Sequence, residues 1–194
     1  MSVLRAISGS LQYSHIIGTG GIGSGIFFSL EGNDTLGREE SRMASLLPYR
    51  DYCKLHIILH YISVLLGNEK FECVPIGSVG NDEPGKTLIE EMKQAGMNVD
   101  YVKISEEYPT LFSVCYQYPD RDGGNITTLA SASSNVSYSD IDQFFSSSAI
   151  DAAKEIILAV PEVPVATRIK LLAYGKERSS LNVAAVSSSE IETF

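Results

Sequence analysis

The chain has 194 residues, of which 44% are hydrophobic and 20% are charged, and its formal net charge is -9. This composition predicts a folded protein with a sizeable core and excludes a disordered or repetitive chain. Because Lys and Arg do not cluster, neither nucleic acid nor an anionic membrane surface is expected as a partner. The longest apolar run, residues 55–66, is too short to cross a bilayer. With three widely spaced cysteines and no targeting segment at its start, the chain is expected to be cytoplasmic.

The first half of the chain alternates apolar runs with glycine, proline and asparagine breakers. Residues 51–66 are apolar on nearly every face, which predicts a buried helix that ends at Gly67. Residues 84–95 carry apolar side chains at helical spacing, with Asp82 or Asn81 as the N-terminal cap. The other expected elements are extended segments at 15–17 and 26–30, a short helix at 37–47, a strand at 71–76 and a turn at 77–85.

The second half continues this alternation and adds a hairpin. Two extended runs, 111–118 and 126–130, flank a linker rich in Pro, Asp and Gly, which is typical of paired antiparallel strands. The other expected elements are strands at 99–104, 155–160 and 181–186 and helices at 140–145 and 164–175. Strands with continuous apolar character that alternate with helices predict an α/β fold, in which a mostly parallel sheet is flanked by helices. The hairpin is expected to belong to a smaller antiparallel sheet that projects from the main one.

Residues 80–87, Gly-Asn-Asp-Glu-Pro-Gly-Lys-Thr, have the spacing of a phosphate-binding P-loop. Such a loop binds phosphate through converging backbone N–H groups, so acidic side chains within it oppose binding. Here Asp82 and Glu83 stand between the glycines, and Pro84 removes one donor. The segment is therefore interpreted as a structural turn, and nucleotide binding by Gly80 to Thr87 is the less favoured alternative.

Two further patterns carry weaker signals. Residues 18–23 match the dinucleotide fingerprint G-x-G-x-x-G, but an extended segment follows them where the fingerprint requires a helix. Cys53, His56 and His60 share one face of the expected helix and include ligands that suit zinc, without a visible fourth ligand. Histidines hydrogen-bonded within the core explain this second pattern more simply, and no metal site is predicted.

The segment from Ile76 to Leu88, together with Gly96 and Val99, resembles the G-x-V-G-x-D-x-x-G region of the PfkB, or ribokinase-like, carbohydrate kinases. Thr110 matches a threonine that is common before the hairpin in that family, and residues 158–164, Leu-Ala-Val-Pro-Glu-Val-Pro, resemble a family strand followed by Glu-x-Pro. The resemblance runs from about residue 16 to 186, and only its central part is specific. It implies a single incomplete ribokinase-like domain over 1–194, with β-lid strands near 26–32 and 111–130.

This resemblance implies phosphoryl transfer from ATP, with Mg, to a sugar or sugar-like hydroxyl held between the core and the lid. The family's catalytic aspartate lies in a Gly-Ala-Gly-Asp motif that also forms the anion hole, and this sequence does not contain the motif. The chain covers about the first two-thirds of the family pattern, so the C-terminal portion of the fold is expected to be missing. We therefore expect no catalytic residue, poor binding of ATP and Mg, and an inactive fragment whose uncovered sheet edge promotes association. The resemblance also implies a homodimer through the lid, an assembly that some relatives form.

The sequence departs from the family at two elements that normally hold sugar hydroxyls. Gly23 and Ser24 stand where the family has an aspartate, and residues 52–56 stand where it has Gly-Gly-x-x-x-Asn. The resemblance carries over Glu162 as a hydroxyl acceptor, Lys54 and His56 as substrate neighbours by their place at a helix start, and Asn182 as a residue beside the nucleotide. The departures favour, as an alternative to a kinase, a non-catalytic sugar-binding or regulatory protein on the same scaffold.

Overall fold

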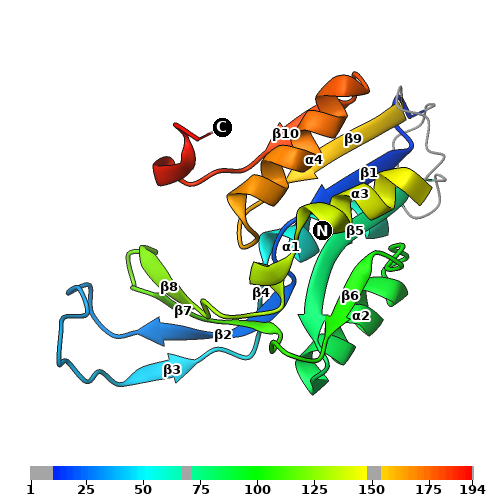
Figure 1. The fold of residues 1–194 in the computed structure, drawn as a ribbon. Coiled ribbons are helices and arrows are strands. Elements are labelled where there is room, and N and C mark those ends of the chain that lie inside the picture. The colour runs from blue at the N-terminus through cyan, green and yellow to red at the C-terminus, as the bar shows by residue number, and fades with distance from the viewer. Residues whose placement is uncertain (1–10, 67–70, 148–153, 194) are drawn as a thin grey trace.

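The computed structural model describes residues 11–66, 71–147 and 154–193, which form two sheets and four α-helices. One sheet lies at the centre of an α/β core, and the other projects from the core as a lid (Figure 1). Within the described residues, no helix combines the length and apolar character needed to span a bilayer.

The core sheet has five strands in the order β10-β9-β1-β5-β6, and every neighbouring pair is parallel. Their apolar runs are nearly continuous because both faces of the sheet are covered by helices. The strands span β1 (His15–Thr19), β5 (Glu72–Gly80), β6 (Val102–Ser105), β9 (Glu155–Ala159) and β10 (Leu181–Ala184).

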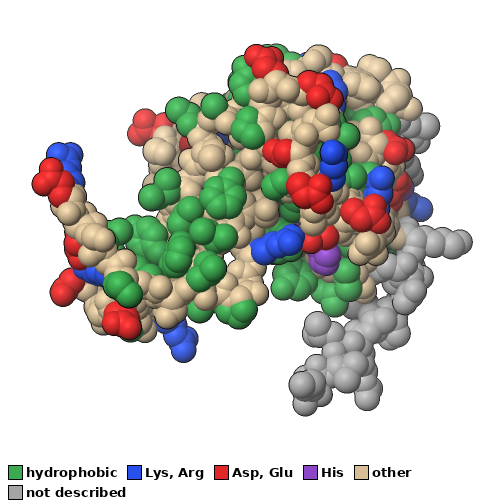
Figure 2. Space-filling view, turned by 90° about the horizontal axis from the view of Figure 1, so that it is seen from below, with side chains coloured by type: hydrophobic (Ala, Val, Ile, Leu, Met, Phe, Trp, Pro, Cys, Tyr) green, Lys and Arg blue, Asp and Glu red, His purple; other side chains and the backbone are tan. Residues whose placement is uncertain are grey.

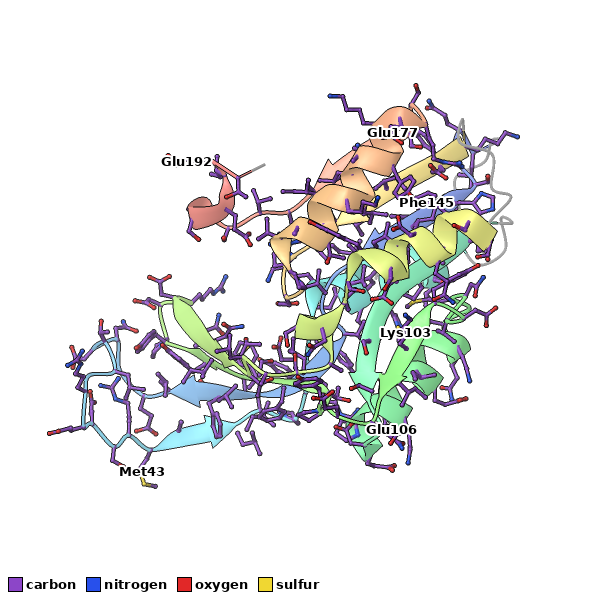
Figure 3. All side chains as sticks on the ribbon, viewed as in Figure 1. Met43, Lys103, Glu106, Phe145, Glu177 and Glu192 are labelled. Carbon is purple, nitrogen blue, oxygen red and sulfur yellow. The ribbon has the colours of Figure 1, made fainter. Side chains whose placement is uncertain are left out.

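Successive residues of a strand point to opposite faces of the sheet, so the core divides into two clusters. Ile16 packs with α1 (Lys54–Leu66) and α2 (Glu83–Gln94), whereas Ile17 packs with α3 (Tyr138–Ser147) and α4 (Val165–Glu177). On the second face, Lys103 of β6 pairs with Asp140 of α3 (Figure 3). The expected α/β fold, a parallel sheet flanked by helices, is confirmed.

The lid sheet has the order β3-β2-β7-β8, and β4 also pairs with β2. Its two outer pairs are antiparallel, but β2 and β7 run parallel in the middle, so the sheet is mixed and not wholly antiparallel as expected. Hydrophobic side chains gather over the lid in the view from below (Figure 2). The strands are β2 (Gly23–Leu30), β3 (Ala44–Leu46), β4 (Asp51–Tyr52), β7 (Leu111–Gln117) and β8 (Gly123–Thr127).

Three expectations about local structure need correction. The prediction of a short helix at 37–47 is wrong, because residues 44–46 form strand β3 and pair with β2. The buried helix begins at Lys54, since Asp51 and Tyr52 are strand residues, and its expected stop at Gly67 lies outside the described residues. The first four residues of the expected turn at 77–85 are instead the end of strand β5.

Candidate functional site

Glu162 lies just beyond the carboxyl end of β9, where the chain turns towards α4. Its φ of 78° is in the left-handed region, which is uncommon for a residue with a side chain and costs of order 1 kcal/mol or more. The loop after β1 packs directly against this turn, because the Gly21 N–H donates to the Pro161 carbonyl oxygen at 2.9 Å. A Cβ on Gly21 would lie 2.5 Å from the Glu162 Cβ, so only glycine allows this approach.

The Glu162 carboxylate is mostly buried and only partly paired. Its Oε1 lies 3.6 Å from the Lys54 Nζ, while its buried Oε2 has no hydrogen-bond partner among the described residues. Burial first, and then the charge of Glu162, raises the pKa of the neighbouring Cys53 thiol, which keeps that thiol neutral. A buried carboxylate oxygen without a hydrogen bond lowers the stability of the folded protein. Because most buried polar atoms do have partners, this oxygen requires an explanation, and a bound ligand is one.

A cavity of about 340 Å³ opens beside Glu162, between the lid and the start of α4. This volume is within the range of small-molecule sites. The hydroxyl of Ser131 is buried in the wall of this cavity, and it too has no hydrogen-bond partner among the described residues. A carboxylate acceptor and a hydroxyl group without partners suit a ligand rich in hydroxyl groups. The lining also includes Leu111, Thr127, Thr128, Leu129, Ser134, Val163 and Pro164.

The turn after β5, which has the P-loop spacing, is held by hydrogen bonds within the protein. Asp82 accepts from the Gly85 N–H at 2.9 Å, from the Thr110 N–H at 2.8 Å and from the Thr110 hydroxyl at 2.5 Å. The Thr110 oxygen in turn accepts from the Gly80 N–H at 2.9 Å. Burial alone would raise the pKa of Asp82, but these hydrogen bonds outweigh it and lower the pKa. Two of the backbone N–H groups on which a P-loop would rely, those of Gly80 and Gly85, are therefore already used.

The glycines of residues 18–23 also allow close packing against neighbouring side chains. A Cβ on Gly20 would lie 2.2 Å from the Val160 Cγ2, and one on Gly18 would lie 2.7 Å from the Leu55 Cδ1. The residues that follow them form strand β2, and a pyrophosphate here would lack the helix N-terminus on which the dinucleotide fingerprint depends. The geometry gives no support to a dinucleotide site.

The structure brings only one of the other predicted site residues to Glu162. Lys54 begins α1 and reaches the carboxylate, whereas His56 is buried in the wall of a different cavity, one that also contains His60. Asn182 lies on β10 and donates to the Leu172 carbonyl oxygen of α4 at 2.8 Å, so its role beside a nucleotide stays a prediction. In the described part of the chain, no three His, Cys, Asp or Glu side chains group together as metal ligands.

The hydroxyl of Ser131 was not predicted from sequence. It lies in a serine-rich stretch, 131–148, where no spacing distinguishes one serine from another. The neighbouring Ser133 has a structural role, because its hydroxyl accepts from the Ile22 N–H at 3.1 Å and lies 3.2 Å from the Ser78 carbonyl oxygen. Only the three-dimensional arrangement separates these two residues.

Comparison with known proteins identifies the fold through structure alone. No protein family model and no curated protein matches the sequence. A ribokinase from Cryptococcus neoformans, solved with ADP, superposes with a TM-score of 0.70 at 18% identity, over 93% of this chain and 55% of that one. A ribokinase from Arabidopsis thaliana with ribose and ATP gives 0.60 at 16% identity, over 90% and 54%.

A nucleoside kinase from Burkholderia thailandensis, solved with inosine, has a TM-score of 0.64 at 11% identity, over 87% of this chain and 51% of that one. The chain therefore has a ribokinase-like fold and spans about 55% of the length of these structures. At such low identity the likeness establishes the fold, while activity and ligands require separate arguments.

Proposed function

We propose that the chain is the sugar-binding part of a ribokinase-like, ATP-dependent carbohydrate kinase. The observation that carries this proposal is the Glu162 side chain, which lines a cavity between the core and the lid and has a buried carboxylate oxygen without a hydrogen-bond partner among the described residues. The ribose and inosine bound to structures of the same fold support a ligand that contains a sugar.

In this proposal, Glu162 accepts a hydrogen bond from a sugar hydroxyl, and that bond satisfies its Oε2. The strained backbone and the close contact with Gly21 fix the position of the carboxylate before a ligand arrives. Lys54 pairs with the other carboxylate oxygen, Oε1, at 3.6 Å. Ser131 provides a second hydroxyl contact from the wall of the same cavity.

The binding of ATP and Mg does not fit the residues that the structure describes. The N–H groups of Gly80 and Gly85 are used internally, and in the described part of the chain no three metal-ligating side chains meet. The sequence also contains no Gly-Ala-Gly-Asp motif. We therefore infer that the 194-residue chain binds sugar without transferring phosphate, and that ATP and Mg would require residues outside it.

A second candidate is a non-catalytic sugar-binding or regulatory protein on this scaffold. It is favoured by the start of α1, where Tyr52, Lys54 and His56 replace the expected Gly-Gly-x-x-x-Asn and Lys54 pairs with Glu162. ATP-dependent sugar phosphorylation by the longest protein that the gene encodes would support the kinase. Sugar binding by that protein without phosphorylation would support this alternative.

Sugar binding is tested by calorimetric titration of the chain with ribose, fructose and inosine. We expect at least one of these to bind, and Glu162→Gln to weaken binding about tenfold or more, since an amide replaces a charged acceptor. Glu107→Gln makes the same chemical change at an exposed position and is expected to bind like the unchanged chain. Equal binding by both variants would contradict the role of Glu162, and no binding of any sugar would contradict the proposal.

We also propose an assembly state and a cellular location. Exposed apolar side chains on the lid, such as Ile126 and Leu129, support a homodimer through the lid. We also propose a cytoplasmic location, in keeping with the three free and buried cysteines.

A further inference from the structure

A second and larger cavity is lined partly by α1, and the proposed sugar site does not use it. Its volume is about 620 Å³, which is within the range of small-molecule sites. Phe27 of the lid, residues 49–52, α1 and Glu91 of α2 contribute to its wall. Neither Glu162 nor Lys54 lines it, so the two cavities are separate.

The wall of this cavity is largely aromatic. The rings of Tyr52 and His56 lie 4.9 Å apart between centroids, and those of His56 and His60 lie 5.6 Å apart. Phe27 and Tyr49 form another ring pair at 5.6 Å. Such ring surfaces attract flat ligands by stacking.

The charged groups of the cavity are already paired. The Arg50 Nη1 lies 3.2 Å from the Glu91 Oε1, and Asp51 accepts from the Ser113 hydroxyl at 2.7 Å. Since each of these charged groups already has a partner, the cavity offers no unpaired charge to attract a charged ligand, which favours an uncharged one.

Two histidines in this wall have buried ring nitrogens without a hydrogen-bond partner among the described residues. His56 is only 3% exposed, and the Nδ1 atoms of both His56 and His60 are buried without a hydrogen bond to any described residue. Burial lowers the pKa of His56 to about 4, and the nearby His60 makes a smaller contribution in the same direction. The His56 ring is therefore neutral near pH 7. A neutral imidazole has one N–H and one bare nitrogen. Because a buried N–H without an acceptor is costly, we assign the bare nitrogen of the His56 ring to Nδ1 and its N–H to Nε2. In His60 the Nδ1 atom is buried as well, so the N–H that can reach a ligand is assigned to Nε2.

We propose that this cavity binds a flat, uncharged heteroaromatic molecule whose ring carbonyl or ring nitrogen accepts hydrogen bonds from the Nε2–H groups of His56 and His60. Stacking on the aromatic wall and two fixed donors together define this ligand class. The proposal does not depend on the sugar site at Glu162.

Caffeine is a suitable probe because it is flat and uncharged and carries two carbonyl acceptors, and indole is its control because it is flat but lacks an acceptor. Ligand-observed NMR with the 194-residue chain should show that caffeine binds and that indole binds about tenfold more weakly. His60→Phe keeps an aromatic ring but removes a hydrogen-bond donor. It should weaken the binding of caffeine about tenfold and leave the binding of indole unchanged. Tyr61→Ala removes part of the cavity wall, so it should weaken the binding of both ligands. Because the Tyr61 side chain is 65% exposed, the protein should stay folded.

Val64→Ala is the matched control, since Val64 lies on the same helix, is 59% exposed and does not line the cavity. It should bind caffeine like the unchanged chain, and thermal unfolding should show that every variant is folded. The proposal is overturned if caffeine does not bind, or if folded His60→Phe and Tyr61→Ala bind it normally. It is also overturned if indole binds as tightly as caffeine, or if Glu162→Gln alone abolishes binding.

Discussion

Two acidic turns lie on either side of β1, one at the end of β5 and one at the end of β9. In the first, both carboxylate oxygens of Asp82 accept hydrogen bonds, and the turn joins the strand to a helix. In the second, Glu162 has a left-handed backbone and one buried oxygen without a partner. The first turn matches a phosphate-binding pattern and the second matches only a short family motif.

The two turns differ in whether their polar groups have partners within the protein, and a ligand can bind only to a group that is left without one. A fully hydrogen-bonded turn contributes to stability and has no donor or acceptor left for a ligand. A strained turn with an open acceptor costs stability and is retained where it serves a ligand. The first predictions below test whether the two turns differ in this way.

The largest expected effect follows the removal of the Asp82 carboxylate. Asp82→Ala leaves the Thr110 and Gly85 N–H groups without an acceptor, so the free energy of unfolding should fall by about 2–4 kcal/mol. Urea denaturation measures this change. Glu162→Ala should lower stability by less than half as much, and an equal loss in both variants would remove the contrast between the turns.

Substitution of Gly85 should have the next largest effect. A Cβ there would lie 2.3 Å from the Gly80 carbonyl oxygen and 2.7 Å from the Thr110 Oγ1, so Gly85→Ala should cost about 1–3 kcal/mol. Gly37→Ala is the control, because its nearest neighbour would be 3.5 Å away. If Gly85→Ala stabilises the chain by improving helix propensity, the tight packing of this turn is contradicted.

The pH dependence of stability should also depend on Asp82. Its pKa is lowered on folding, so its contribution is complete above the unfolded value of about 3.9 and is lost as the pH falls through the folded value. The difference in unfolding free energy between the unchanged chain and Asp82→Ala should therefore shrink below about pH 4. Denaturation curves at pH 7 and pH 3 measure it, and a constant difference would contradict the assigned shift.

Much of the fold could be predicted from the sequence because its signals are local. Continuous apolar runs marked the parallel strands, and Asp82 marked the start of α2. The parallel pairing of β2 with β7 could not be predicted, since it joins segments that are far apart in the chain. The helix expected at 37–47 failed because an isolated helix of that length is marginal, whereas pairing with β2 satisfies the backbone of residues 44–46.

The candidate site was less accessible to sequence reasoning. Glu162 and Lys54 were named from a family resemblance, and the structure places them together. His56 was named for the same reason but faces another cavity, because neighbouring positions on a helix point in different directions. Ser131 carried no signal, since its importance lies in having no partner after folding.

A smaller effect is expected on association. Leu129 on the lid is 92% exposed and Ile126 is 69% exposed, so Leu129→Lys should weaken self-association. Sedimentation at several concentrations measures it. Val183→Lys on the exposed edge strand β10 makes the same test for the other sheet. A chain that is monomeric at every concentration would contradict both expectations.

The smallest effect is expected at Lys86. If the turn at 80–87 is purely structural, Lys86→Ala should change neither stability nor any nucleotide binding that can be measured. Loss of ATP binding in this variant alone would instead favour a P-loop and overturn the contrast between the two turns.

The most direct test of the account is the carboxyl carbon resonance of Glu162, followed by NMR as a sugar is added to the chain. We predict that a sugar that binds will shift this resonance to saturation while the Asp82 carboxyl resonance stays in place, because only Glu162 has a free acceptor. A bound sugar that leaves the Glu162 resonance unchanged, or that shifts Asp82 instead, would contradict the assignment of the site.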